Sequence, residues 1–133
     1  MLIQNRPTVS ARHLNGLLNH KEMLYVLHRE RARADRTGRE FSIIVFQPPK
    51  DTPHNQRALL RLARTVVRRA RETDEVGWFD DHSVCAMLFD CPVPSARQFA
   101  TDVYRMMDEI PLENMCRIYR NFVQNAFYNW ITG

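Results

Sequence analysis

The sequence predicts an α+β fold, a β-α-β-β-α-β sheet that is preceded by one additional helix. A continuous apolar run over residues 41–46 has the length of a buried strand. Two further apolar runs, 76–79 and 84–89, flank a short polar turn and predict a β-hairpin. Amphipathic helical patterns separate these strands. Two strand–helix–strand crossovers around a hairpin make a ferredoxin-like sheet with the crossover helices on one face.

The first helical pattern develops from Leu14 and runs to about Arg36. Arginines gather in its last turns, which suits the negative end of the helix dipole. Gly38 is the predicted stop, because glycine commonly follows the last turn of a helix. Apolar residues recur in this segment at three- and four-residue spacings. They are Leu17, Leu18, Met23, Leu24, Val26 and Leu27.

The strand over residues 41–46 ends at the prolines of residues 48–49, since proline cannot continue a hydrogen-bonded ladder. A loop over residues 50–56 leads to a second helix, whose arginines lie opposite its apolar face. That face consists of Leu59, Leu62, Ala63, Val66, Val67 and Ala70.

The predicted hairpin tip consists of Asp80, Asp81 and His82, and Ser83 leads into the second strand of the hairpin. A third helix opens at Pro94 or Ser95 after a proline-containing loop. Its inner face consists of Ala96, Phe99, Ala100, Val103, Met106 and Met107.

A last short strand is predicted over residues 115–119. The chain then divides into a flexible leader (1–11), one domain (12–120) and a C-terminal tail (121–133). The tail is rich in aromatic residues, which favours burial against this domain or against a second copy.

Composition narrows the class of protein. The net charge is +4, no apolar run reaches the length of a membrane span, and the N-terminus does not resemble a signal peptide. Three cysteines without CxxC spacing argue against a disulfide framework or a zinc site, and favour a reducing, cytoplasmic location.

Arginine clusters near residues 29–39 and 61–71 could face an acidic partner or phosphates. Interspersed acidic residues and the lack of alternating aromatics argue against nucleic acid.

Four segments in order resemble the GGDEF family of bacterial diguanylate cyclases. Residues 14–20, LNGLLNH, are similar to part of the family motif DxLTGLxNR, whose first Asp falls on Arg12, whose Thr falls on Asn15 and whose final Arg falls on His20. The helix-to-strand transition over residues 29–46, the RxxD pattern at Arg71 and the segment after residue 84 are also similar. The resemblance covers about residues 12–119 and implies a truncated nucleotide-cyclase-like fold.

The chain departs from the family at the signature itself. The five positions of Gly-Gly-Asp/Glu-Glu-Phe are occupied by Asp80, Asp81, His82, Ser83 and Val84. The family's glycines let the backbone approach GTP, and its fourth position supplies a carboxylate to magnesium. Ser83 is a poor replacement for that carboxylate.

A second metal-binding position of the family, at the end of the first strand, falls on Phe46 or Gln47. The segment for phosphate and guanine contacts is shortened to residues 48–56. Phosphoryl transfer depends on metal and positioned phosphates. The resemblance therefore implies a degenerate domain without cyclase activity, metal or cofactor.

The RxxD pair, Arg71 and Asp74, is retained. In active members this pair binds cyclic di-GMP in product inhibition, and Arg68 would add phosphate contacts. The structural alternative is that Arg71 caps the second helix while Asp74 pins the turn. Two functions stay open, a non-catalytic signalling module that acts through a protein partner or dimerisation, and a cyclic di-GMP receptor.

Overall fold

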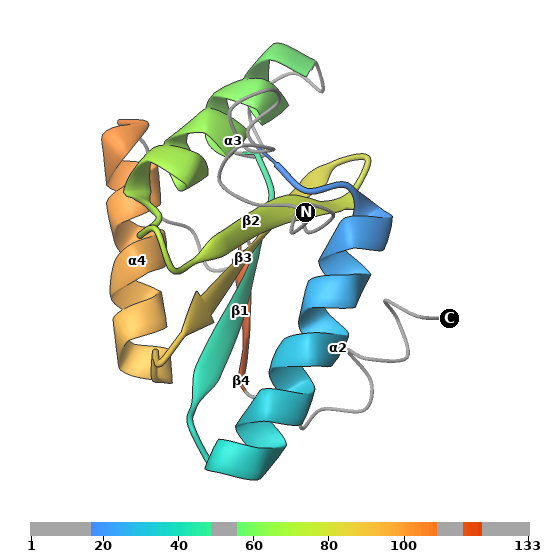
Figure 1. The fold of residues 1–133 in the computed structure, drawn as a ribbon. Coiled ribbons are helices and arrows are strands. Elements are labelled where there is room, and N and C mark those ends of the chain that lie inside the picture. The colour runs from blue at the N-terminus through green and yellow to red at the C-terminus, as the bar shows by residue number, and fades with distance from the viewer. Residues whose placement is uncertain (1–16, 49–55, 109–115, 121–133) are drawn as a thin grey trace.

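The computed structural model describes residues 17–48, 56–108 and 116–120. Their elements, in chain order, are α2 (His20–Thr37), β1 (Phe41–Phe46), α3 (Gln56–Arg69), β2 (Glu75–Asp80), β3 (Ser83–Phe89), α4 (Val93–Met106) and β4 (Cys116–Arg120) (Figure 1). The strands pair antiparallel in the spatial order β2-β3-β1-β4. This order confirms the predicted β-α-β-β-α-β sheet and its additional N-terminal helix.

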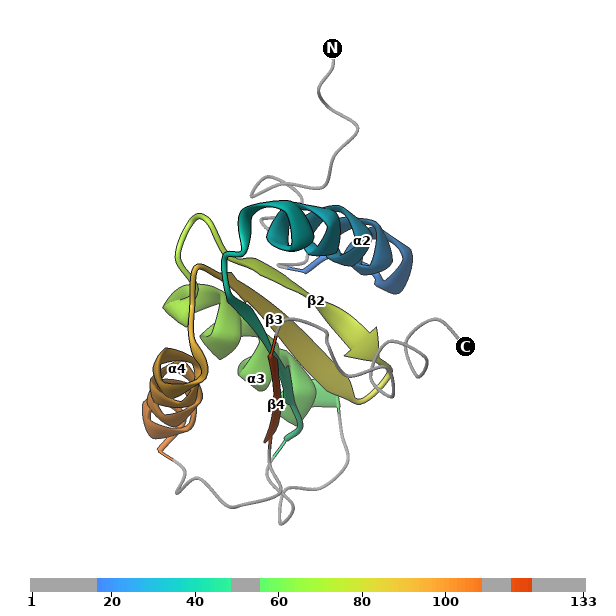
Figure 2. The same cartoon turned by 90° about the horizontal axis from the view of Figure 1, so that it is seen from below.

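The sheet lies between two layers of helix. Figure 2 shows α3 and α4 side by side on one face and α2 on the other. Buried side chains fill both interfaces between the sheet and the helices. Because both faces of β1 are covered, this strand is apolar at every position except Ser42. The core under α3 and α4 includes Ile44, Phe46, Leu62, Val66, Val84, Phe99, Val103 and Tyr104. The core under α2 includes Leu18, Met23, Val26, Ile43, Val45, Phe79 and Met87.

Local hydrogen bonds define both ends of α2. The Asn19 side chain accepts the Glu22 N–H, and the Glu22 carboxylate accepts the Asn19 N–H, each at 2.8 Å. This reciprocal capping box starts the helix at His20. Gly38 ends it with φ 72°, and its N–H donates to the Ala34 carbonyl. The predicted stop at Gly38 is therefore confirmed.

The start predicted for this helix is wrong, because Leu17 and Leu18 lie before it. Leu18 instead forms a parallel bridge with Gly77 on the outer side of β2. Its N–H donates to the Val76 carbonyl at 2.9 Å, and its carbonyl accepts the Trp78 N–H at 2.8 Å. A Cβ at position 77 would lie 3.2 Å from the Leu18 carbonyl oxygen, so glycine permits the approach. Apolar spacing alone cannot separate such a crossing segment from a helix.

The remaining boundaries shift by one or two residues. Helix α4 begins at Val93, ahead of the predicted start at Pro94 or Ser95, and Pro92 is its N-cap. Strand β4 covers Cys116–Arg120, whereas the predicted Met115 lies outside the described residues. The leader (1–11) and the aromatic tail (121–133) also lie outside them. Within the described ranges, none of the helices combines the length and apolarity that a membrane crossing requires.

Candidate functional site

The hairpin tip is a two-residue turn, Asp81 and His82, between β2 and β3. The Asp80 Oδ1 atom accepts the His82 N–H at 2.7 Å, which closes the turn as aspartate commonly does. Asp80, Asp81 and His82 are exposed, whereas Ser83 and Val84 are buried in β3. The three predicted turn residues therefore share the tip, but the last two signature positions belong to the core.

A β-bulge just before the tip connects the hairpin to α2. The register shifts between Trp78 and Asp80, so Phe79 is the extra residue. The Phe79 carbonyl oxygen lies 3.1 Å from Nδ1 of His20, at the start of α2. Residue spacing had not marked His20 as a site residue. Its role depends on a contact between positions 59 residues apart.

A pocket of about 610 Å³ opens beside the tip. Trp78 and Phe79 contribute aromatic surface to it, and Asp80 and Asp81 contribute two carboxylates. Among the described residues that line it there is no arginine or lysine. Carboxylates repel phosphate groups at short range, so these described walls are unsuited to a nucleoside triphosphate.

The two metal-binding positions that the resemblance implies do lie together. Phe46, at the end of β1, pairs directly with Val84 of β3, next to Ser83. Magnesium is bound in proteins mainly by carboxylate oxygens, whereas these positions supply a hydroxyl and either a phenyl ring or, if the position is Gln47, an uncharged amide. The donor set does not fit the ion. Within the described part of the chain, no three His, Cys, Asp or Glu side chains converge on one metal position.

Phe46 is part of the core instead, and the exposed Gln47 accepts a hydrogen bond from the core residue Tyr104 through its backbone carbonyl. The Phe46 ring centroid lies 6.2 Å from that of Phe99 and 5.8 Å from that of Tyr104. The Tyr104 hydroxyl donates to the Gln47 carbonyl at 3.2 Å, and burial raises the pKa of that phenol. An aspartate at position 46 would replace aromatic packing with a buried charge.

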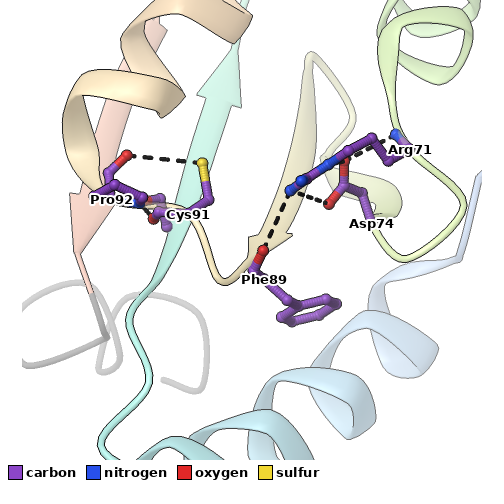
Figure 3. Close-up of polar contacts among 6 residues, drawn as sticks. Arg71, Asp74, Phe89, Cys91 and Pro92 are labelled. Carbon is purple, nitrogen blue, oxygen red and sulfur yellow. Dashed lines mark hydrogen bonds and ion pairs between the residues drawn. The ribbon is translucent and has the colours of Figure 1, made fainter.

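The Arg71–Asp74 turn lies at the other end of the hairpin (Figure 3). The Asp74 carboxylate accepts the Arg71 backbone N–H at 2.9 Å, and the Asp74 N–H donates to the Arg71 carbonyl at 2.9 Å. The guanidinium lies 3.4 Å from Asp74 and donates to the Phe89 carbonyl at 3.2 Å. Asp74 is fully buried, whereas the Arg71 side chain is 56% exposed. Asp74 thus holds the turn, and Arg71 spans from the turn to the end of β3.

The neighbouring arginines do not join this pair. Arg69 donates to Asp102 at 2.9 Å, and its guanidinium lies 4.8 Å from the centroid of the Phe99 ring. Arg68 lines a groove on α3 with Arg61 and Arg64. Among the described residues, no hydrogen bond or ion pair joins Arg68 to Arg71 or Asp74, so the phosphate contact expected of Arg68 stays a prediction. The predicted cap of α3 by the Arg71 side chain is not seen among its described contacts either.

A second pocket, of about 480 Å³, lies between α2 and the base of the hairpin. Glu72 and Thr73 of the RxxD turn line it. Three arginines there face five carboxylates: Arg29, Arg33 and Arg39 against Glu30, Glu40, Glu72, Glu75 and Asp90. The excess of negative charge disfavours a dianionic dinucleotide in this pocket.

All three cysteines are free thiols. Cys85 is buried in β3, and burial raises its pKa far above that of an exposed thiol. Cys91 follows β3 near Arg71, and its Sγ lies 3.7 Å from the Pro92 carbonyl oxygen (Figure 3). Burial raises the pKa of Cys91, and the positive charge of Arg71 opposes this rise. Buried thiols with a raised pKa react slowly, so Cys85 and Cys91 are structural residues.

Solved structures with the same fold identify the class of domain. A DGC protein from Thermotoga maritima matches with a TM-score of 0.66 at 12% identity, over 85% of this chain and 92% of that one. Diguanylate cyclase SiaD from Pseudomonas aeruginosa, in complex with its activator SiaC, matches with a TM-score of 0.66 at 17% identity, over 90% of this chain and 54% of that one. No family profile and no curated protein matches the sequence.

A third match has a bound ligand. The GGDEF domain of DgcB from Caulobacter crescentus, in complex with c-di-GMP, matches with a TM-score of 0.61 at 12% identity, over 79% of this chain and 71% of that one. The fold of this chain is therefore that of GGDEF domains, as the sequence motifs predicted. Identities this low establish the fold alone.

Proposed function

We propose that this chain is a non-catalytic regulatory module with a GGDEF fold, which acts in bacterial signalling by binding another protein or a second copy of itself. The replacement of the signature at the hairpin tip carries the proposal. Asp80 and Asp81 stand where glycines approach the substrate in the resembling family, and Ser83 and either Phe46 or Gln47 stand where carboxylates bind magnesium. Both supports of phosphoryl transfer are replaced at once.

The environment of these residues strengthens the proposal. Phe46 is packed against two aromatic rings, and Ser83 is 1% exposed. Neither position could bind a hydrated cation without rearrangement of the core. Three free thiols also support the proposed cytoplasmic location, because oxidising compartments favour disulfides.

The decisive experiment is incubation of the purified chain with GTP and magnesium or manganese, followed by chromatographic detection of cyclic di-GMP. The expected result is no product above a control without protein. An active diguanylate cyclase under the same conditions is the positive control. Product formation that scales with the concentration of this chain would overturn the proposal.

A second candidate function is reception of cyclic di-GMP through Arg71 and Asp74. The exposed guanidinium of Arg71 favours it, since a half-exposed arginine could leave Phe89 for a ligand. The buried, already occupied carboxylate of Asp74 and the acidic pocket nearby count against it. Titration calorimetry with cyclic di-GMP distinguishes a receptor from a module that acts only through a protein partner. Binding by the wild type that Arg71→Ala abolishes would establish the receptor.

A further inference from the structure

Helix α3 has one strongly basic face. It contains five arginines and no acidic residue, and Arg57, Arg61, Arg64 and Arg68 recur at spacings of four, three and four residues. At 100° per residue these four side chains fall within an arc of about 60°, and the stripe spans about 16 Å along the axis. The helix therefore presents a straight row of guanidinium groups.

The charge of this row is not neutralised by described neighbours. Arg61 donates to the Met107 carbonyl at 3.1 Å. Among the described residues, no carboxylate lies within ion-pair distance of Arg57, Arg64 or Arg68. The fifth arginine of the helix, Arg69, lies off the row and pairs with Asp102. Uncompensated like charges at i, i+3 and i+4 destabilise a helix, so the row is costly unless an anion neutralises it.

Apolar side chains lie beside the row. Leu60 is 40% exposed and Met106, near the end of α4, is 41% exposed. They are two of the three large hydrophobic side chains that are exposed in the described part of the chain. Both line a groove of about 680 Å³ together with the four arginines. A partner for this groove needs carboxylates and apolar side chains on one surface.

We infer that the groove on α3 binds an acidic amphipathic helix of a partner protein. Carboxylates at i, i+4, i+7 and i+11 of such a helix have the same rise as the four arginines, and guanidinium forks pair well with carboxylates. An apolar residue beside those carboxylates would cover Leu60 and Met106. Nucleic acid fits less well, because the described lining offers no aromatic ring for base stacking.

This inference rests on the proposed function, for which it specifies the binding surface and the chemistry of the partner. It assigns the partner to the α3–α4 side of the sheet, opposite α2 (Figure 2). The hairpin tip and the RxxD turn take no part in it.

The test measures fluorescence anisotropy of a labelled 18-residue helical peptide with glutamates at i, i+4, i+7 and i+11 and leucines beside them. We expect binding to the wild type at micromolar to submicromolar concentration. A scrambled peptide of equal composition, whose glutamates no longer share a face, should bind about tenfold more weakly. Equal binding of the two peptides, or none at about 200 µM, overturns the inference.

Variants locate the site. The double variant Arg64→Gln and Arg68→Gln should weaken peptide binding about tenfold, and Leu60→Ser about threefold. The matched control is Lys21→Gln with Arg36→Gln, which removes the same charge from exposed positions of α2 and should leave binding unchanged. If both double variants lost the same affinity for the peptide, the net charge of the protein alone would explain binding, and the site on α3 would be refuted.

Two further measurements separate the alternatives. Tighter binding of a labelled DNA duplex or single-stranded RNA than of the peptide would replace the protein partner with nucleic acid and overturn the inference. The GTP assay distinguishes the two proposals. Absent peptide binding without cyclase product refutes only this surface, whereas cyclase product refutes the non-catalytic assignment whether or not the peptide binds.

Discussion

Replacement of Asp74 is expected to cost far more stability than replacement of its partner Arg71. The Asp74 carboxylate is fully buried and accepts a short backbone hydrogen bond of 2.9 Å. A hydrogen bond to a buried charged acceptor contributes about 1.5–3 kcal/mol, so Asp74→Ala should lower the unfolding free energy by about 2–3 kcal/mol. The guanidinium contacts are longer, at 3.4 Å, on a side chain that is 56% exposed. Arg71→Ala should therefore cost less than about 1 kcal/mol.

The assay is urea denaturation followed by tryptophan fluorescence, with thermal unfolding in parallel. At about 4 °C per kcal/mol, Asp74→Ala should lower Tm by about 8–12 °C and Arg71→Ala by less than about 4 °C. Asp74→Asn, which keeps an acceptor oxygen, should fall between them. Equal losses for the Asp74 and Arg71 alanine variants would refute the division into a structural carboxylate and a dispensable arginine.

Three further predictions concern stability and thiol chemistry. Gly77→Val should lower the unfolding free energy by about 1–3 kcal/mol in chemical denaturation, because the added carbons meet a backbone carbonyl at 3.2 Å. In a thiol-titration time course at pH 8, Cys116 should react well before Cys85, whose burial raises its pKa; equal native rates would contradict this order. Hydrogen bonds from Gln98 and from an arginine of α3 lower the pKa of Asp102. Above about pH 4, Asp102→Asn should therefore lower the free energy of unfolding by up to about 1 kcal/mol. In denaturation curves, this difference between wild type and variant should vanish as the pH falls below the native pKa of Asp102.

The elements that the sequence predicted well are those with a local signal. Strand β1 is buried on both faces, so its apolar run is continuous and needs no knowledge of its neighbours. Gly38 marks the end of α2 because the left-handed conformation, φ 72°, favours glycine. The signal for the hairpin tip is also local, since the Asp80 side chain closes the turn by accepting a hydrogen bond from a residue only two positions away.

The contacts that sequence reasoning missed join distant parts of the chain. The helical period continues through Leu18, but the Asn19 capping box starts the helix at His20, and Leu18 pairs with the distant Gly77 instead. His20 meets Phe79 across 59 residues, and no spacing rule connects them. The structural alternative placed Arg71 at the end of α3, but its guanidinium donates to the Phe89 carbonyl at the end of β3.

The bridge between Leu18 and Gly77 also bears on how this sheet can associate. An edge strand offers unpaired N–H and C=O groups, and an extended segment of another chain can add to it. On β2 two of those groups, the Val76 carbonyl and the Trp78 N–H, are already bonded to Leu18. Strand addition at this edge would first have to displace the segment that leads into α2. The protein thus protects the β2 edge of its sheet with its own backbone.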